Sequence, residues 1–272
     1  MKLQGKTALV LGGAKGIGKE IGLALARAGA TVVLTHYDWP AEAAAMRDEL
    51  AALGGDHLAV KVDLRDPAAI QELFATIRAR YTALHILINN IERGGMPIVH
   101  GPYTPEQWEL EMATTLRAKW WVMRSALPLL QENGEGAVIT LSSIAGIVGR
   151  SGPAGFIFND GYSAANRAIS SFTETWAREG APSVRVNELM LGFFETRHAE
   201  QTRGWGLLSA EQQAAIRDHI LLKRTGKIEE IIAAVFFLLQ DATYMTGAVL
   251  RMDGGYVLGG EGIPPMPVGV EK

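Results

Sequence analysis

A glycine-rich turn lies near the amino terminus, between an apolar run and an amphipathic segment. It consists of Gly12-Gly13-Ala14-Lys15-Gly16-Ile17-Gly18. Glycines at such a turn let the backbone bend sharply and approach a pyrophosphate, which rests on the amino terminus of the following helix. Helix–strand packing also selects small residues, so the pattern alone is a weak signal. Its place after the first strand favours nucleotide binding by Gly12, Lys15, Gly16, Ile17 and Gly18.

Apolar runs and amphipathic segments alternate along the whole chain, which predicts alternating strands and helices. The expected strands are 7–11, 31–35, 57–62, 85–89, 137–141, 183–189 and 248–252. The expected helices are 17–28, 41–53, 67–81, 105–131, 161–179, 210–221 and 228–239, with a glycine-rich loop before 161. Continuous apolar strands separated by such helices are typical of a covered parallel sheet. We therefore predict a single-domain α/β protein, a Rossmann-like doubly wound parallel sheet with helices on both faces.

The composition argues against several classes of protein. Of the 272 residues, 48% are apolar and 20% charged, and 26 basic against 29 acidic residues give a net charge of −3. No block of like charges occurs, which argues against a nucleic-acid partner or a membrane surface. The chain has no cysteine, so disulfides and thiolate chemistry are excluded. The apolar stretch 231–239 is too short to span a bilayer, and no signal peptide is expected. We expect a cytoplasmic protein.

Seven motifs occur in order along nearly the whole chain. They are GGAKGIG at 12–18, Asp63-Leu64, Asn89-Asn90, Ser142-Ser143, Tyr162 followed by SAAN, GFFET at 192–196 and TGAVLRMDGGY at 246–256. This set resembles the short-chain dehydrogenase/reductase family, and within it the branch of 3-oxoacyl-carrier-protein reductases and their sugar or steroid relatives. The resemblance implies hydride transfer between a nicotinamide dinucleotide and a carbonyl or alcohol carbon. It assigns residues 1–253 to a dinucleotide-binding domain with a lid at 192–225, followed by a Gly/Pro-rich tail over 254–272.

The resemblance also implies roles for individual residues. Ser143 would polarise the substrate carbonyl, and Tyr162 would pass the proton while hydride moves. A second set of residues would hold the cofactor. Asp63, beside Leu64, would bond the adenine amino group, and Asn89 would line the adenosine site. Thr196, in the segment that starts at Gly192, would contact the carboxamide.

Two departures from the family pattern lie beside these residues. The lysine expected four residues after Tyr162 is Asn166, and the asparagine of the preceding helix is Thr115. A tyrosine without a cationic neighbour titrates near 10, so about one in a thousand is ionised at pH 7. Carbonyl reduction needs only a protonated donor, and loss of positioned proton transfer costs ~10²–10⁴ in rate. We therefore expect a slow reductase rather than a fast dehydrogenase.

Two charged residues bear on this expectation. Lys119 lies four residues after Thr115 on the same helix face and could supply a cation, although we favour a solvated lysine. Glu92 stands where the family has glycine, and its carboxylate would crowd or repel an anionic cofactor. The alternative hypothesis is therefore a degenerate family member that binds nucleotide or metabolite without turnover, as a sensor, partner subunit or scaffold.

The end of the second predicted strand bears on the choice of cofactor. NAD-specific enzymes usually have an acid there that bonds the ribose 2′-hydroxyl. Here the position is His36, and Asp38 follows two residues later. Lys15 resembles the basic residue that meets the 2′-phosphate in NADP-dependent members, although it could equally be a solvated loop charge. We predict NADP(H), with NAD as the alternative.

The segment 192–225 contains Phe193, Phe194 and Trp205 among arginines, which suits a part-apolar carbonyl substrate. Equally, these rings could pack on the core beneath a surface lid. His198 has no second histidine at ligand spacing, so no metal site is expected.

The assembly and the tail leave alternatives open. Family relatives usually form tetramers, and we expect a homo-oligomer, either a tetramer or a dimer. Trp120 and Trp121 suit an interface or equally core packing. The tail from Gly254 either wraps across a neighbouring subunit or is loose.

Overall fold

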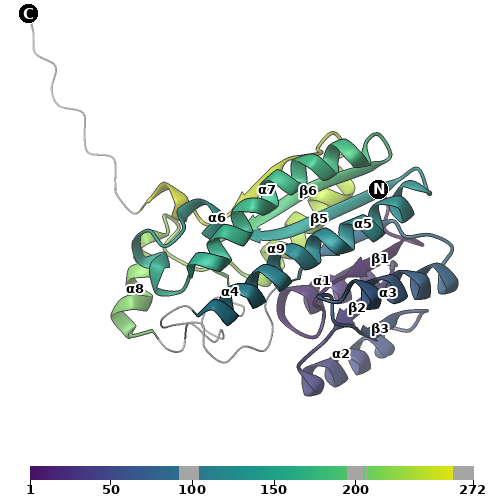
Figure 1. Cartoon of the computed structure of the whole chain (residues 1–272), viewed down its shortest axis with the longest axis horizontal. Helices are drawn as coiled ribbons and strands as arrows, with labels where there is room; N and C mark the ends of the chain where they lie inside the picture. The colour runs from purple at the N-terminus through teal and green to yellow at the C-terminus, as the bar shows by residue number, and fades with distance from the viewer. Residues whose placement is uncertain (92–103, 195–204, 206–207, 260–272) are drawn as a thin grey trace, which may run out of the picture.

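The alternating segments form one seven-stranded sheet with the order β3-β2-β1-β4-β5-β6-β7 (Figure 1). The computed structural model describes residues 1–91, 104–194, 205 and 208–259. Every pair of neighbouring strands in the sheet is parallel. The chain winds outward from β1 to β3 and then continues on the other side of β1 with β4, so the order reverses between β1 and β4. This arrangement confirms the doubly wound parallel sheet, and ligands of such sheets bind at the carboxyl ends of the strands near that reversal.

The strands are β1 (Thr7–Val10), β2 (Thr31–His36), β3 (Leu58–Lys61), β4 (Ile86–Asn89), β5 (Gly136–Ser143), β6 (Val184–Leu191) and β7 (Val249–Met252). The helices are α1 (Gly16–Arg27), α2 (Pro40–Ala52), α3 (Pro67–Arg80), α4 (Pro105–Glu111), α5 (Ala118–Gln131), α6 (Ala145–Val148), α7 (Asp160–Gly180), α8 (Ala210–His219) and α9 (Ile228–Phe236). Shorter helical stretches are η1 (Met112–Arg117), η2 (Gly152–Phe156), η4 (Phe237–Asp241) and η5 (Tyr256–Leu258). In the described part of the chain, no helix combines the length and the apolar character that a membrane crossing requires.

Two regions differ from the predicted elements. The helix predicted over 105–131 is α4 and α5 joined by the π-helical stretch η1. The loop predicted after β5 contains α6 and η2, so that prediction was wrong. Glycines interrupt the helical spacing there, but buried apolar residues such as Ala145 and Ala154 hold the two short helices against the core.

Helices cover both faces of the sheet. Residues of α1, α2 and α9 share one apolar core with the strands, and residues of α3, α5 and α7 share the other. Along β1, Ala8 and Val10 belong to the first core and Leu9 to the second. Because alternate strand residues point to opposite faces and both faces are covered, the strands are continuous apolar runs in the sequence.

A third apolar cluster lies beyond the carboxyl ends of β5 and β6, where η2, α8 and the residues after β6 meet. Phe158 stacks on Phe193 with 5.4 Å between ring centroids and 6° between planes. Phe193 and Trp205 are each only 2% exposed, so these rings pack on the core. Tyr256 is also buried, with its ring centroid 4.4 Å from that of His219. Residues 254–259 of the predicted tail therefore fold onto the body, while residues 260–272 lie outside the described residues.

Candidate active site

The glycine turn between β1 and α1 packs closely against β2 and the residue after β4. The N–H of Gly12 donates to Thr35 Oγ1 at 3.2 Å, and Asn90 Nδ2 donates to the Gly12 carbonyl at 3.5 Å. A Cβ on Gly12 would lie 2.5 Å from the Asn90 carbonyl oxygen, and one on Gly18 would lie 2.3 Å from the Gly12 oxygen. A side chain at either position would push the turn away from the strands.

The amino terminus of α1 fits the pyrophosphate of a dinucleotide. Gly16 has a φ of +58°, and no described atom beyond its own chain neighbours lies within 4 Å of where its Cβ would be. The side chain of Lys15, the residue before α1, does not cap the helix, and the first N–H groups of a helix are a favourable site for an anion. Ile17 lines the adjacent pocket.

Lys15 precedes α1 and extends toward the segment after β2. Its Nζ lies 3.1 Å from the centroid of a Trp39 ring and 3.9 Å from a carboxylate oxygen of Glu42. Lys15 thus connects the glycine turn to the start of α2, and it is engaged by neighbours rather than simply solvated.

The ends of β2 and β3 contain His36 and the segment with Asp63. Burial, followed by the charges of Arg47 and Lys61, lowers the pKa of His36, so its ring is neutral at pH 7. A guanidinium nitrogen of Arg65 lies 2.6 Å from Asp63 Oδ2, and this hydrogen bond holds the pKa of Asp63 below its usual value. The Asp63 carboxylate therefore stays ionised and is held by its own turn.

Several residues expected to bind the cofactor are not on this surface or are not described. Leu64 is buried in the core under α3 and α5. Asn89 is fully buried, and its Nδ2 donates to the Lys119 carbonyl at 3.5 Å; its neighbour Asn90 lines the pocket instead. Thr196 lies outside the described residues, as does Glu92, whose carboxylate was expected to repel the cofactor.

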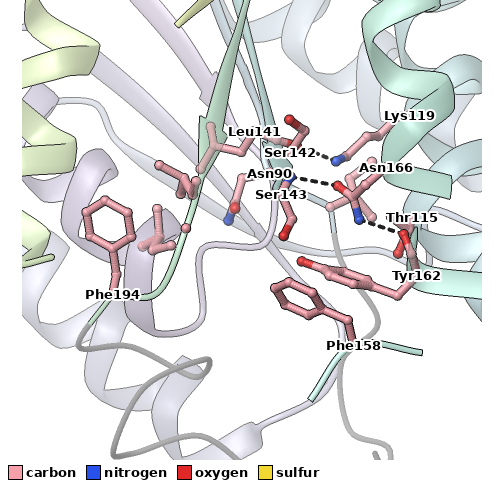
Figure 2. A pocket seen from close by; sticks show the side chains of 14 residues that line it. Asn90, Thr115, Lys119, Leu141, Ser142, Ser143, Phe158, Tyr162, Asn166 and Phe194 are labelled. Carbon is pink, nitrogen blue, oxygen red and sulfur yellow. Dashed lines mark hydrogen bonds between the residues drawn. The ribbon is translucent and has the colours of Figure 1, made fainter. Parts of the chain in front are cut away.

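A pocket at the carboxyl ends of the central strands brings together all four predicted catalytic residues (Figure 2). Ser143 ends β5, Thr115 belongs to η1, and Tyr162 and Asn166 lie one turn apart on α7. The complete lining is Ile17, Asn90, Ile91, Thr115, Lys119, Leu141, Ser142, Ser143, Phe158, Tyr162, Asn166, Leu191, Gly192 and Phe194. The pocket thus extends from Ile17 and Gly192, two residues predicted to bind the cofactor, to the hydroxyl groups of Ser143 and Tyr162.

Asn166 fastens β5 to α7. Its Oδ1 accepts a hydrogen bond from the Ser143 N–H at 2.9 Å, and its Nδ2 donates to the Tyr162 carbonyl at 3.0 Å. Asn166 is 1% exposed, so water does not compete for these bonds. In Figure 2 the hydroxyl groups of Ser143 and Tyr162 point into the same part of the pocket.

Lys119 is buried, and the expectation of a solvated lysine was wrong. The residue is 2% exposed, and its Nζ donates to the Leu141 carbonyl at 2.6 Å. Thr115 and Lys119 lie one turn apart on the same face of the helical segment, and this face is turned toward the pocket. Among the described residues that line the pocket, Lys119 is the only charged one.

Two buried carboxyl groups flank the pocket and were not predicted. Glu111 accepts a hydrogen bond from the Thr115 hydroxyl, and Glu188 accepts one from the Ser142 hydroxyl. Burial raises the pKa of Glu188, while the Ser142 hydrogen bond and the charge of Lys119 act in the opposite direction. A sequence signal for Glu188 existed, because an acid inside an apolar strand is rarely buried without a partner.

Aromatic side chains form the apolar part of the pocket. Phe158 comes from the segment between Ser143 and Tyr162. Its ring centroid lies 5.8 Å from that of Tyr162. Phe194 lines the pocket as well and follows β6 (Figure 2). A substrate that reaches Tyr162 therefore meets apolar rings next to the hydroxyl groups.

Comparisons with known proteins agree with this geometry. A family profile described as enoyl-(acyl carrier protein) reductase matches residues 12–257. The chain is also 33% identical over 259 residues to the 3-oxoacyl-[acyl-carrier-protein] reductase of Escherichia coli, covering 94% of this chain and 98% of that protein. The chain belongs to the short-chain dehydrogenase/reductase family.

Two further relatives extend the match to other substrates and to a solved structure. The chain is 31% identical over 266 residues to the D-beta-hydroxybutyrate dehydrogenase of Rhizobium meliloti, covering 92% of this chain and 98% of that protein. A double variant of a short-chain dehydrogenase/reductase from Serratia marcescens superposes with a TM-score of 0.79 at 28% identity, covering 94% of this chain and 100% of that one. The protein is an NAD(P)-dependent oxidoreductase acting on carbonyl or hydroxyl groups, which confirms the prediction from the motifs.

Proposed function

We propose that the protein reduces the carbonyl group of a small or acyl-type substrate, with Tyr162 as the proton donor. The observation that carries this proposal is the convergence of the Ser143 and Tyr162 hydroxyl groups on one pocket that also contacts α1 through Ile17. The apolar rings of Phe158 and Phe194 favour a part-apolar substrate. The 3-oxoacyl and hydroxybutyrate names of the relatives support the same class of substrate.

In this mechanism the chain supplies polarisation and a proton. A bound nicotinamide dinucleotide supplies the hydride that adds to the carbonyl carbon. Ser143 donates a hydrogen bond to the carbonyl oxygen, and Tyr162 then gives its hydroxyl proton to the same oxygen, so ketone, hydride and proton become the alcohol. Asn166 keeps the Ser143 backbone at a fixed position relative to the first turn of α7. Because Asn166 brings no charge to Tyr162 from within α7, we expect slower turnover than in family members with lysine at this position.

The cofactor of this proposal is NADP(H). Lys15 and Arg65 are cations near the ends of β2 and β3, and the neutral His36 stands where an acid would accept a ribose 2′-hydroxyl. These charges favour a 2′-phosphate. Asp38 follows closely and keeps NAD as the alternative. Lys15→Ala is expected to weaken NADPH binding more than NADH binding.

We further propose that the protein is a homo-oligomer, either a tetramer or a dimer, and that its substrate is a small molecule. Trp120 and Trp121 are only partly buried on α5, with ring centroids 4.6 Å apart. Partly buried aromatic rings on a helix surface suit an interface between copies of the chain. Sedimentation of the purified protein tests this part of the proposal.

A binding titration tests the cofactor first. NADPH and NADH are titrated into the purified protein while tryptophan fluorescence is followed. Oxidation of the bound cofactor is then measured with acetoacetate and ethyl acetoacetate, with Tyr162→Phe as the matched control. Cofactor binding together with ketone-dependent oxidation that Tyr162→Phe abolishes supports the proposal, whereas failure to bind either dinucleotide contradicts it.

A second candidate function is binding without turnover. The contacts of Asn166 favour it, because this amide is used by the backbone of Ser143 and Tyr162 and offers no charge for proton transfer. The expected result is then tight cofactor binding with no oxidation by any ketone. If the protein binds cofactor without turnover, the double variant Thr115→Asn/Asn166→Lys is expected to create ketone reduction.

A further inference from the structure

A buried ammonium group lies close to Tyr162 but comes from another helix. We infer that Lys119 acts through Tyr162 as the cation of the active site, favouring release of the tyrosine proton from its position on α5. The inference rests on the proposed function, in which Tyr162 is the proton donor. Lys119 is thus a positioning charge and does not itself touch the substrate.

The first support is the location of Lys119. It lines the same pocket as Tyr162 and Ser143, and its Nζ donates to the carbonyl of Leu141, two residues before Ser143 on β5. In Figure 2 the side chain of Asn166 lies between Lys119 and Tyr162. In this view the Asn166 amide stands between the ammonium group and the phenol ring.

The second support is the burial of the region between them. Thr115, Lys119 and Asn166 are each no more than 2% exposed. Water screens a charge weakly in such surroundings, so a fixed ammonium influences a nearby phenol more than it would at the surface. A nearby positive charge favours the ionised form of an acid.

The third support is the balance of charges around α7. In the described elements packed against α7, the charged side chains are Lys119 and Arg124 on α5, Arg117 on η1, Glu106, Glu109 and Glu111 on α4, and Arg185 and Glu188 on β6. Four of these side chains are exposed, namely Arg117, Arg124, Glu106 and Glu109. Arg185 donates to carbonyl groups at the far end of β6, including that of Leu238 at 2.9 Å. Glu111 and Glu188 each accept a hydroxyl hydrogen bond, which leaves Lys119 as the buried cation nearest Tyr162.

The sequence pattern gives this placement a chemical meaning. The family resemblance expects an amide near position 115 and an ammonium at position 166. In this chain the amide of Asn166 on α7 and the ammonium of Lys119 on α5 both line the pocket at Tyr162. Asn166 accepts the Ser143 N–H, so a charge near Tyr162 comes from α5 and not from α7.

The test is a spectroscopic titration of tyrosinate that needs neither substrate nor cofactor. The absorbance of the wild-type protein against pH, minus that of Tyr162→Phe, isolates Tyr162. Tyr256 does not interfere, since burial raises its pKa to about 12. We expect the pKa of Tyr162 to lie about one unit below 10, and Lys119→Met to raise it by about one unit. Lys119→Met/Asn166→Lys is expected to lower it again.

Controls separate the charge from the fold. Lys61→Met removes an exposed lysine of β3 and is expected to leave the Tyr162 transition unchanged. A folded Lys119→Met protein with an unchanged transition overturns the inference. If Lys119→Met does not fold, the wild-type titration still decides, because a Tyr162 transition at or above 10 overturns the inference.

The outcome is independent of whether the protein reduces ketones. Suppose that Lys119→Met shifts the pKa of Tyr162 but that none of the tested ketones causes NADPH oxidation. This result contradicts the proposed function and keeps the charge assignment. Suppose instead that the protein reduces ketones with the same pH profile in wild type and Lys119→Met. This result keeps the proposed function and overturns the assignment of Lys119 as the cation.

Discussion

The glycine turn and the pocket beside Tyr162 hold their positions by different means. In the turn, Gly12 and Gly18 matter because backbone atoms approach where a side chain would be. In the pocket, Asn166 and Lys119 matter because their polar atoms bond the backbone of other elements. The position of the turn is therefore sensitive to added volume. The pocket is sensitive to the loss of single polar atoms, even where volume is kept.

The largest effect is expected from removing one oxygen atom in the pocket. Tyr162→Phe keeps the ring that packs near Phe158 but removes the proton donor. Ketone reduction should fall by ~10²–10⁴, while the affinity for NADPH and the melting temperature stay as in wild type. Steady-state kinetics with ethyl acetoacetate measure the change. A rate within a few-fold of wild type would show that another group donates the proton.

Adding one methyl group to the turn is expected to have the next largest effect. In Gly18→Ala the new Cβ meets the Gly12 carbonyl, and this overpacking costs about 1–3 kcal/mol of stability. Gly16→Ala is the matched variant, because its Cβ enters open space at a positive φ and costs about 1–2 kcal/mol. Thermal denaturation should show the larger loss for Gly18→Ala.

Cofactor affinity distinguishes Gly16→Ala and Gly18→Ala further. Gly16→Ala fills the space beside the amino terminus of α1, so NADPH affinity should fall even though the protein remains folded. Fluorescence titration measures this affinity. Unchanged affinity in Gly16→Ala would contradict the assignment of that space to a phosphate.

A change of one atom at Asn166 is expected to have an intermediate effect. Asn166→Asp keeps the acceptor for the Ser143 N–H but loses the donor to the Tyr162 carbonyl. It also adds a negative charge, which raises the pKa of a nearby tyrosine and makes it a poorer proton donor. Ketone reduction should fall by about tenfold, with a loss of about 1 kcal/mol in stability.

Asn166→Leu separates hydrogen bonding from charge. It removes both hydrogen bonds without adding charge, so the buried Ser143 N–H loses its partner at a cost of about 1–3 kcal/mol. Chemical denaturation should therefore find Asn166→Leu less stable than Asn166→Asp. The reverse order would mean that the two hydrogen bonds contribute little to the position of β5 against α7.

The same difference explains what the sequence could predict. The turn is a local feature, so its glycines, the preceding strand and the following helix are all visible within about twenty residues. The meeting of Ser143 with Tyr162 followed from the order of family motifs along the chain. Neither inference needed the packing of distant elements.

The burial of Lys119 could not be predicted with the same ease, because it depends on how α5 lies against β5 and α7. A signal was present, since Thr115, Lys119, Val122 and Ala126 form one helical stripe and all four are buried. The general preference of lysine for solvent outweighed that stripe. In the same way, the acid at 188 stood out in an apolar strand, but its partner Ser142 is adjacent only in the folded sheet.

The smallest effect is expected at an exposed charged contact that belongs to neither region. Glu230 is in the first turn of α9, where it pairs with Arg224 at 2.6 Å and accepts the N–H of Lys227 at 2.8 Å. The hydrogen bond with Arg224, followed by that with Lys227, lowers the pKa of Glu230 to about 2. Because the folded-state pKa is depressed, the contact stabilises the protein above the ordinary glutamate range. This stabilisation is lost as the pH falls from about 4.5 toward 2.

Glu230→Gln therefore provides a baseline for the other variants. Because the pair is exposed, its removal should cost only about 0.5 kcal/mol at pH 7. The difference from wild type should shrink as the pH falls toward 2, as followed by denaturation across that range. Cofactor affinity and ketone reduction should not change, since this carboxylate is not part of the glycine turn and does not line the pocket at Tyr162. If Glu230→Gln lost as much ketone reduction as Asn166→Asp, the activity would follow the general stability of the protein. The effects of the variants in the turn and in the pocket could then not be assigned to local contacts.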